Sequence, residues 1–258
     1  MHIAFGTPFG GVAHPEHYRR KAIVQASALG HTFSYIEIDL VIVSKARNSI
    51  LDQVPPQVDV LWFVDADINL PPNAHILLDH LKDNPLVSGL YFARSYPHLP
   101  QVYNRAGAGM TNFAFLPFIN LPNEPFYADA VGAGCLLMHM DLVRDTVEKH
   151  AAWRTTVEAW QKRWLKRRQV NDETLAVRRA LELGVRLDAR FEFLEQIGED
   201  FYFCESVRHH TGVRPLVDPQ VECEHVGLAP ITRQHFQQAC TSGQVQFTAT
   251  KGGKGNLT

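Results

Sequence analysis

The sequence lacks the features of a secreted or membrane-spanning protein. It has only four cysteines, none in a C-x-x-C pair: Cys135, Cys204, Cys223 and Cys240. Scattered cysteines argue against a disulfide framework or a zinc site and favour reduced thiols. No segment approaches the roughly 18 consecutive apolar residues of a membrane span, and the first residues lack the basic-then-apolar pattern of a signal peptide. We therefore expect a cytoplasmic protein with no membrane span.

An excess of charge of either sign is also missing. The formal net charge is −2 at pH 7, with 20% charged and 45% hydrophobic residues. These ordinary globular values exclude disorder for the bulk of the chain. A chain of 258 residues is long enough for one sizeable core, so we expect a single domain over residues 1–258.

A regular alternation of strand-like and helix-like segments fills the first ninety residues. Residues 58–64 are nearly all apolar, which is typical of a strand buried on both faces. The alternation predicts an α/β fold with a mostly parallel central sheet flanked by helices and right-handed crossovers. The expected strands are 3–6, 33–40, 58–64, 86–92, 134–140, 214–217 and 221–225, with antiparallel edge strands at 101–104 and 112–118. The expected helices are 16–29, 45–54, 73–82, a charged segment from 141 to about 184, and 199–210.

Two carboxylates follow the most apolar strand, in the motif Val64-Asp65-Ala66-Asp67. They emerge at the carboxyl end of the strand, which is where open α/β sheets bind ligands. Because alternate residues of an extended chain point to the same side, Asp65 and Asp67 can converge on one point. Such oxygen ligands suit Mg²⁺ or Mn²⁺, which in turn can hold a diphosphate. The plainer interpretation is that both are turn residues at a strand end.

The motif and its surroundings resemble the GT-A glycosyltransferases, which carry an Asp-x-Asp motif after a nucleotide-binding half-sheet. The resemblance covers roughly residues 3–93 and 128–228. It implies a nucleotide-sugar donor, with UDP-glucose or another UDP-sugar as the usual partner of such a motif, and it places several residues at the donor. These donor-binding residues are Thr7, Pro8, Asp39, Arg47, Asn48, Asp65, Gly132 and Gly134. The alternative for Arg47 is a surface arginine on a helix.

Further acidic and imidazole groups come late in the chain. Glu199 and Asp200 stand in the expected first turn of a helix, where the helix dipole favours ionised carboxylates. An ionised carboxylate beside the acceptor can take its hydroxyl proton; from the resemblance we assign this catalytic role to Asp200 and orientation of the acceptor to Glu199. The alternative is an N-terminal helix charge with no catalytic part. The resemblance also implies His225 as the third metal ligand. Arg94, just after the expected strand 86–92, is a further candidate that can face the same cleft as the metal and the donor.

Residues 149–190 are basic, with eleven Lys or Arg against five Asp or Glu. The plain interpretation is a solvated helical face, and the tryptophans at 153, 160 and 164 fit packing of that helix on the core. The sharper interpretation is a surface for a polyanion. Its densest part supplies the candidate DNA contacts, Lys162, Arg163, Lys166, Arg167 and Arg168.

A compact GT-A enzyme with a basic insertion resembles the bacteriophage-type enzymes that glycosylate hydroxymethylpyrimidines in DNA. The resemblance implies a hexosyltransferase acting on 5-hydroxymethylcytosine in DNA, in the host cytoplasm if the protein is phage-encoded. It implies a nucleotide-sugar half over about 1–93, an acceptor half over about 94–228 with a helical insertion at about 141–190, and a C-terminal helix and flexible tail at 229–258.

Other functions stay open at this point. The acceptor can instead be a glycan, a lipid-linked sugar or a protein. A nucleotidyltransferase also uses paired carboxylates and a metal, but apart from Lys21 the stretch around Gly10 and Gly11 lacks the nearby lysines of its phosphate loop. A non-catalytic nucleic-acid-binding protein leaves the placement of Asp65 and Asp67 unexplained.

Overall fold

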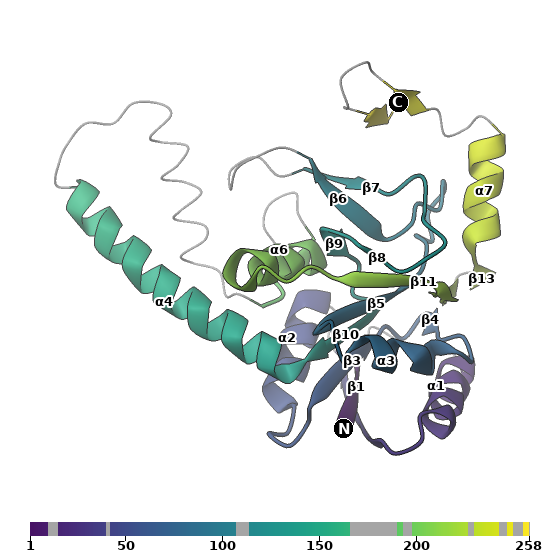
Figure 1. Cartoon of the computed structure of the whole chain (residues 1–258), viewed down its shortest axis with the longest axis horizontal. Helices are drawn as coiled ribbons and strands as arrows, with labels where there is room; N and C mark the ends of the chain where they lie inside the picture. The colour runs from purple at the N-terminus through teal and green to yellow at the C-terminus, as the bar shows by residue number, and fades with distance from the viewer. Residues whose placement is uncertain are drawn as a thin grey trace.

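The computed structural model describes residues 1–9, 15–39, 42–106, 114–165, 190–192, 198–226, 230–242, 247–249 and 255–257. Its centre is a seven-stranded sheet, seen in Figure 1. In spatial order the strands are β2 (Thr32–Asp39), β1 (His2–Phe9), β3 (Val60–Val64), β10 (Cys135–His139), β5 (Leu86–Leu90), β11 (Leu216–Glu222) and β8 (Phe126–Tyr127).

Most strands of this sheet run in the same direction. β1 pairs parallel with β2 and β3, and β11 pairs parallel with β5. β10 is antiparallel to both of its neighbours, β3 and β5, and β8 is antiparallel to β11. Since β10 reverses direction between them, β3 and β5 point the same way and their carboxyl ends share one edge. The predicted α/β class, a mostly parallel central sheet flanked by helices, is confirmed.

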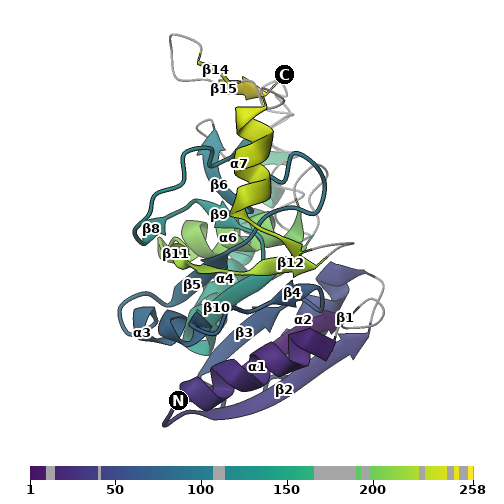
Figure 2. The same cartoon turned by 90° about the vertical axis from the view of Figure 1, so that its right-hand side faces the viewer.

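The sheet is buried on both faces, as the apolar run in β3 predicts. Leu61 and Phe63 belong to one hydrophobic core, and Trp62 belongs to the other. Helices α2 (Val43–Gln53), α4 (Met140–Leu165) and α6 (Glu199–Thr211) contribute to the first core. Helices α1 (Pro15–Ser27) and α3 (Leu77–His80) contribute to the second, and Figure 2 shows α1 lying along the sheet.

Several element boundaries differ from the prediction. The helix expected over 73–82 is a 3₁₀ turn (Ala74–Ile76) followed by the short α3. The two late strands expected at 214–217 and 221–225 are one strand, β11, with a register shift after Asp218, followed by β12 (Glu224–Val226). The edge strands expected near 101–104 and 112–118 are β6 (Val102–Ala106) and β7 (Ala114–Pro117). They form a separate small sheet with β9 (Ala130–Val131) instead of extending the central one.

A second small sheet determines the geometry of the site. Its strands are β13 (Pro230–Ile231), β12 and β4 (Ile68–Asn69). β4 begins directly after Asp67, and His225 of β12 pairs with Ile68. This antiparallel pairing therefore brings the end of the Asp-x-Asp motif next to a residue 158 positions later in the sequence.

The remaining described elements lie at the periphery. α4 extends away from the sheet in Figure 1, and much of the predicted insertion, residues 166–189, lies outside the described residues. α7 (Arg233–Thr241) follows β13, and in the predicted flexible tail β14 (Phe247–Ala249) pairs with β15 (Gly255–Leu257). Within the described part of the chain, no helix combines the length and apolarity needed to cross a membrane.

Candidate active site

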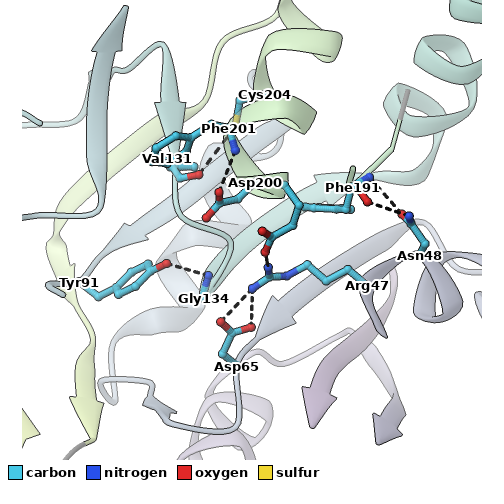
Figure 3. Close-up of polar contacts among 11 residues, drawn as sticks. Arg47, Asn48, Asp65, Tyr91, Val131, Gly134, Phe191, Asp200, Phe201 and Cys204 are labelled. Atoms are coloured by element: carbon cyan, nitrogen blue, oxygen red, sulfur yellow. Dashed lines mark hydrogen bonds and ion pairs between the residues drawn. The ribbon is translucent and has the colours of Figure 1, made fainter. Parts of the chain in front are cut away.

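Acidic and basic side chains from α2, β3 and α6 meet at the carboxyl edge of the central sheet (Figure 3). Arg47 comes from α2 and donates through Nη2 to both carboxylate oxygens of Asp65, at 2.8 and 2.9 Å. Through Nη1 it donates to Glu199 at the start of α6. One guanidinium thus joins two carboxylates that are 134 residues apart in the sequence.

The Arg47 guanidinium is enclosed, with a side chain only 3% exposed. Its guanidinium carbon lies 6.0 Å from the ring centre of Phe63 and 5.7 Å from that of Phe191. Burial alone would lower the pKa of Arg47, but the charges of Asp65, Glu199 and Asp200 outweigh burial, so the pKa is raised. The interpretation of Arg47 as a surface arginine is therefore wrong.

Asp67 faces a different set of partners. Its Oδ2 lies 3.4 Å from Nε2 of His225 and 3.3 Å from Nη1 of Arg94. Burial alone would raise the pKa of Asp67, but the hydrogen bond and charge of His225 and the charge of Arg94 outweigh it and lower the pKa. The structure thus brings together two of the three predicted metal ligands and the further candidate Arg94.

The imidazole of His225 is oriented by the backbone. Its Nδ1 lies 2.7 Å from the carbonyl oxygen of Phe92, which only accepts, so Nδ1 carries the proton that it donates. In the neutral ring the lone pair of Nε2 then faces the carboxylate oxygen of Asp67. Two facing acceptors repel, and either a proton on Nε2 or a cation between the groups removes the repulsion. A backbone-held imidazole beside a carboxylate is the arrangement found around many metal ions.

Asp65 does not complete a three-residue metal site, because its carboxylate is bound to Arg47. Among the described residues, no group of three or more His, Cys, Asp and Glu side chains is arranged to hold a metal ion. Mg²⁺ and Mn²⁺ sites in phosphate-handling enzymes take one or two protein ligands, and their remaining ligands are water and phosphate oxygens. Asp67 and His225 fit a site of that kind, with Asp65 held apart by the arginine.

Asp200, which follows Glu199 in the first turn of α6, has a raised pKa. Burial, the nearby charge of Glu199 and, to a smaller extent, Asp65 raise the pKa of Asp200 to about 6, against the opposing effects of Arg47 and of the Phe201 N–H. The Phe201 N–H donates to its Oδ1 at 2.9 Å. A carboxyl group with a pKa near neutrality is suited to exchange a proton at physiological pH.

Tyr91 lies close to Asp65 and Asp200, and no local pattern in the sequence indicates it as a site residue. Burial raises the pKa of Tyr91 well above its ordinary value, and the charges of Asp65 and Asp200 add to this effect. The Gly134 N–H donates to the Tyr91 hydroxyl at 3.0 Å. Packing against Tyr91 explains why Gly132 and Gly134 have no side chain. A Cβ on Gly132 would lie 2.1 Å from the Tyr91 hydroxyl oxygen, and one on Gly134 would lie 2.8 Å from the ring carbon Cζ.

The other predicted donor residues lie near the ends of β1 and β2 and in the middle of α2. Thr7 and Pro8 are buried at the end of β1, and Thr7 Oγ1 accepts from the buried Lys21 at 2.5 Å. Asp39 is exposed at the end of β2. The Asn48 side chain exchanges two hydrogen bonds with the backbone of Phe191, at 2.8 and 3.0 Å, so in this structure it holds a loop.

The side chains of the predicted DNA-contacting residues lie outside the described part of the structure. Lys162 and Arg163 lie in α4, but their side chains are outside the described part of the structure. Lys166, Arg167 and Arg168 lie outside the described residues altogether. Their role stays a prediction.

Comparisons with known proteins give weak structural similarity only. No family model and no curated protein matches the sequence. Among solved structures, the protein A197 from STIV has 13% identity and a TM-score of 0.49, with 88% of this chain and 86% of that chain covered. GalNAc-T7, solved with UDP, GalNAc and Mn²⁺, has 11% identity and a TM-score of 0.46; 96% of this chain is covered but only 48% of that one.

A glycosyltransferase involved in the glycosylation of the major capsid of PBCV-1 has 15% identity and a TM-score of 0.32, over 55% of this chain and 62% of that chain. The chain therefore spans about half to five-eighths of these two glycosyltransferases. Identities and TM-scores at this level do not place the chain in a family.

Proposed function

We propose that the chain is a metal-dependent glycosyltransferase that moves a sugar from a nucleoside-diphosphate donor, a UDP-sugar such as UDP-glucose, to an acceptor hydroxyl. The observation that carries the proposal is the meeting, at one sheet edge, of the Asp67–His225 pair with the Asp65–Arg47–Glu199 cluster and Asp200. Carboxyl edges of open α/β sheets are where such ligands bind.

In this proposal each group has a distinct part. Asp67 and His225 hold Mn²⁺ or Mg²⁺, which when bound neutralises the diphosphate and its developing charge. Arg94, which is 58% exposed, supplies a second positive charge beside the diphosphate. Arg47 holds Asp65 and Glu199 in fixed positions, and these two carboxylates compensate its positive charge.

Asp200 acts as the general base. The acceptor oxygen forms a bond to the anomeric carbon of the donor sugar while Asp200 takes the proton of the acceptor hydroxyl. The bond from the anomeric carbon to the diphosphate oxygen breaks, and the nucleoside diphosphate leaves with the bonding electrons. A pKa of about 6 leaves Asp200 mostly ionised at neutral pH and therefore able to accept that proton.

A donor screen by thermal shift tests this proposal. UDP, GDP, CDP and their glucose forms are added to the protein with and without Mn²⁺. A ligand that binds only the folded state raises the melting temperature, by several degrees at saturation in a domain of this size. We expect a shift with a uridine nucleotide that requires Mn²⁺ and that is lost in Asp67→Asn.

The matched control is Asp141→Asn, since Asp141 is 93% exposed and its only ion pair among the described residues is with Arg144. This variant should keep the full metal-dependent shift. If Asp67→Asn keeps it as well, the assignment of the metal site is wrong. Release of UDP from UDP-glucose, without formation of glucose 1-phosphate and without release of pyrophosphate from UTP, distinguishes the glycosyltransferase from a nucleotidyltransferase.

The proposal that the acceptor is 5-hydroxymethylcytosine in DNA depends on the basic segment, residues 149–190. The cytoplasmic location is likewise a prediction from the sequence.

A further inference from the structure

A cavity lies between the loop that leaves β5 and helix α7. Its volume is about 310 Å³, at the lower end of the range for small-molecule sites. The residues that line it are Tyr96, His98, His235, Gln238, Ala239 and Ser242. None of them is Lys, Arg, Asp or Glu, so the lining suits an uncharged ligand.

The two histidines present opposite hydrogen-bonding groups. Nδ1 of His98 lies 3.0 Å from the carbonyl oxygen of Ala93 and must donate to it, which makes Nε2 the acceptor of the neutral ring. Nδ1 of His235 accepts from the N–H of Thr232 at 3.2 Å, which makes its Nε2–H a donor. The ring centres are 5.9 Å apart. A hydroxyl group both donates and accepts, so a ligand with hydroxyls is complementary to this pair.

The rest of the lining fits the same class of ligand. Tyr96 is a large aromatic side chain that is 54% exposed, so its ring offers an apolar surface that water does not favour. Gln238 is exposed on α7 and adds an amide with both donors and an acceptor. An aromatic surface combined with a few placed polar groups suits a polyhydroxylated ring, which has an apolar side and a rim of hydroxyls.

The loop that forms the cavity is held in an unusual conformation. His98 has φ of 57°, in the left-handed region that residues with side chains rarely adopt. Its N–H donates to the carbonyl of Ser95 at 2.8 Å, and its side chain is held by Ala93. Backbone strain of this kind persists where surrounding contacts maintain it, and it is concentrated at ligand sites.

The cavity is physically connected to the proposed transfer site. Arg94, two residues before Tyr96, contacts Asp67 at 3.3 Å. The carbonyl of Phe92 orients His225, and the ring of Phe92 stacks on Phe236 of α7 at 5.9 Å. One strand end therefore supports both the proposed metal site and one wall of the cavity.

We propose that this cavity is a carbohydrate-binding subsite that takes a neutral pyranose unit of the acceptor. The identification of the bound sugar as part of the acceptor rests on the proposed function. The binding of a sugar in the cavity does not depend on it. A nucleic-acid acceptor is disfavoured at this place because the lining offers no cation for a phosphate.

Saturation-transfer NMR with methyl pyranosides tests the subsite on the full chain. The panel contains the methyl α- and β-glycosides of glucose, galactose, mannose and N-acetylglucosamine, without nucleotide or metal. We expect at least one to bind the wild type. Gln238→Ala should weaken its binding about threefold to tenfold, the effect of one lost hydrogen bond, and Tyr96→Ala should weaken it about tenfold or more.

Matched controls separate the subsite from general damage. Gln237→Ala changes an exposed neighbour on the same helix, and Tyr127→Ala removes a tyrosine of similar exposure, 51%, elsewhere on the surface. Both should leave glycoside binding unchanged. The proposal is overturned if no glycoside binds the wild type, if Gln238→Ala and Tyr96→Ala bind as the wild type does, or if 5-hydroxymethyl-2′-deoxycytidine binds in their place.

The two proposals fail separately in this design. Asp67→Asn should lose the Mn²⁺-dependent nucleotide shift and keep glycoside binding, whereas Gln238→Ala should keep the nucleotide shift and bind glycosides more weakly. Glycoside binding without any nucleotide shift would support the subsite and contradict the glycosyltransferase.

Discussion

Asp65 and Asp67 belong to one short motif but have different partners. Asp65 is bound by Arg47 at 2.8 Å, and Asp67 faces His225 at 3.4 Å. The sequence predicted that both aspartates and the histidine hold one metal ion. The structure shows Asp65 bound to Arg47 and Asp67 facing His225, and in the proposed function only Asp67 and His225 would contact the cation.

The raised pKa of Asp200 leads to a prediction at the scale of a single residue. Its pKa is raised from 3.8 to about 6, so between these values the folded state holds a proton that the unfolded state has released. The free energy of unfolding therefore falls as pH rises through this window, by up to about 3 kcal/mol at about 1.4 kcal/mol per unit. Asp200→Asn removes this titration, so its stability relative to the wild type should increase from pH 4 to pH 7, measured by urea unfolding.

Asp141→Asn is the control, because that carboxylate is exposed on the surface. A difference between Asp200→Asn and wild type that is equal at both pH values would contradict the raised pKa. For the proposed reaction, in which Asp200 is the base, we also expect kcat/KM of the wild type to fall below about pH 6, where Asp200 becomes protonated.

At the scale of elements, the site depends on how α2, β3 and α6 meet. Arg47 is on the buried side of α2, Asp65 follows β3, and Glu199 opens α6. α6 has no side-chain cap at Gly198, so acidic residues in its first turn, Glu199 among them, complement the positive end of the helix dipole. The Arg47 guanidinium then joins three elements through two buried or partly buried ion pairs.

Removing Arg47 should therefore destabilise the fold strongly. Arg47→Gln leaves Asp65 and Glu199 without their cation, and the loss of one partner from a buried ion pair costs about 3–5 kcal/mol. Arg47→Lys keeps the charge and should cost less, because it loses only the forked geometry of the guanidinium. Urea unfolding of both variants measures the two effects.

Arg144→Gln is a matched control, since Arg144 pairs with Asp141 on the surface and is 51% exposed. Exposed pairs of this kind contribute little. If Arg47→Gln costs no more than Arg144→Gln, the cluster is not the structural centre of the site. If Arg47→Gln does not fold and Arg47→Lys does, the free energy of unfolding of Arg47→Lys relative to the wild type is compared with that of Arg144→Gln.

At the scale of the whole molecule, charge is divided unevenly. The chain has a net charge of −2 although residues 149–190 carry eleven basic and five acidic residues. Part of this segment forms the outer half of α4, which extends from the body of the protein in Figure 1. A basic segment set apart from an acidic remainder is the pattern expected of a polyanion-binding surface.

This charge division predicts binding to duplex DNA that weakens with salt. Changing Lys162, Arg163, Lys166, Arg167 and Arg168 to Gln should lower the affinity and reduce the slope of log K against log salt by about one for each lost phosphate contact. Fluorescence anisotropy with labelled duplex at several salt concentrations measures both. Lys82→Gln, at an exposed lysine on another part of the surface, should have no effect, and absence of binding at low salt would refute the DNA hypothesis.

The sequence by itself determined the layers of this protein and the edge that carries its polar groups. Apolar runs such as 58–64 predicted strands buried on both faces, and the position of Asp65 and Asp67 after one of them placed the site. Local periodicity is enough for this, because the pattern of burial along a segment is set by its secondary structure.

Only the tertiary structure decided which side chains are partners. The contact of Arg47 with Glu199, that of Asp67 with His225, and the fit of Tyr91 against Gly132 and Gly134 join segments far apart in the sequence. They depend on the reversed direction of β10 and on the register of β4 with β12. No local pattern encodes these features, because strand order and register follow from the packing of the whole core.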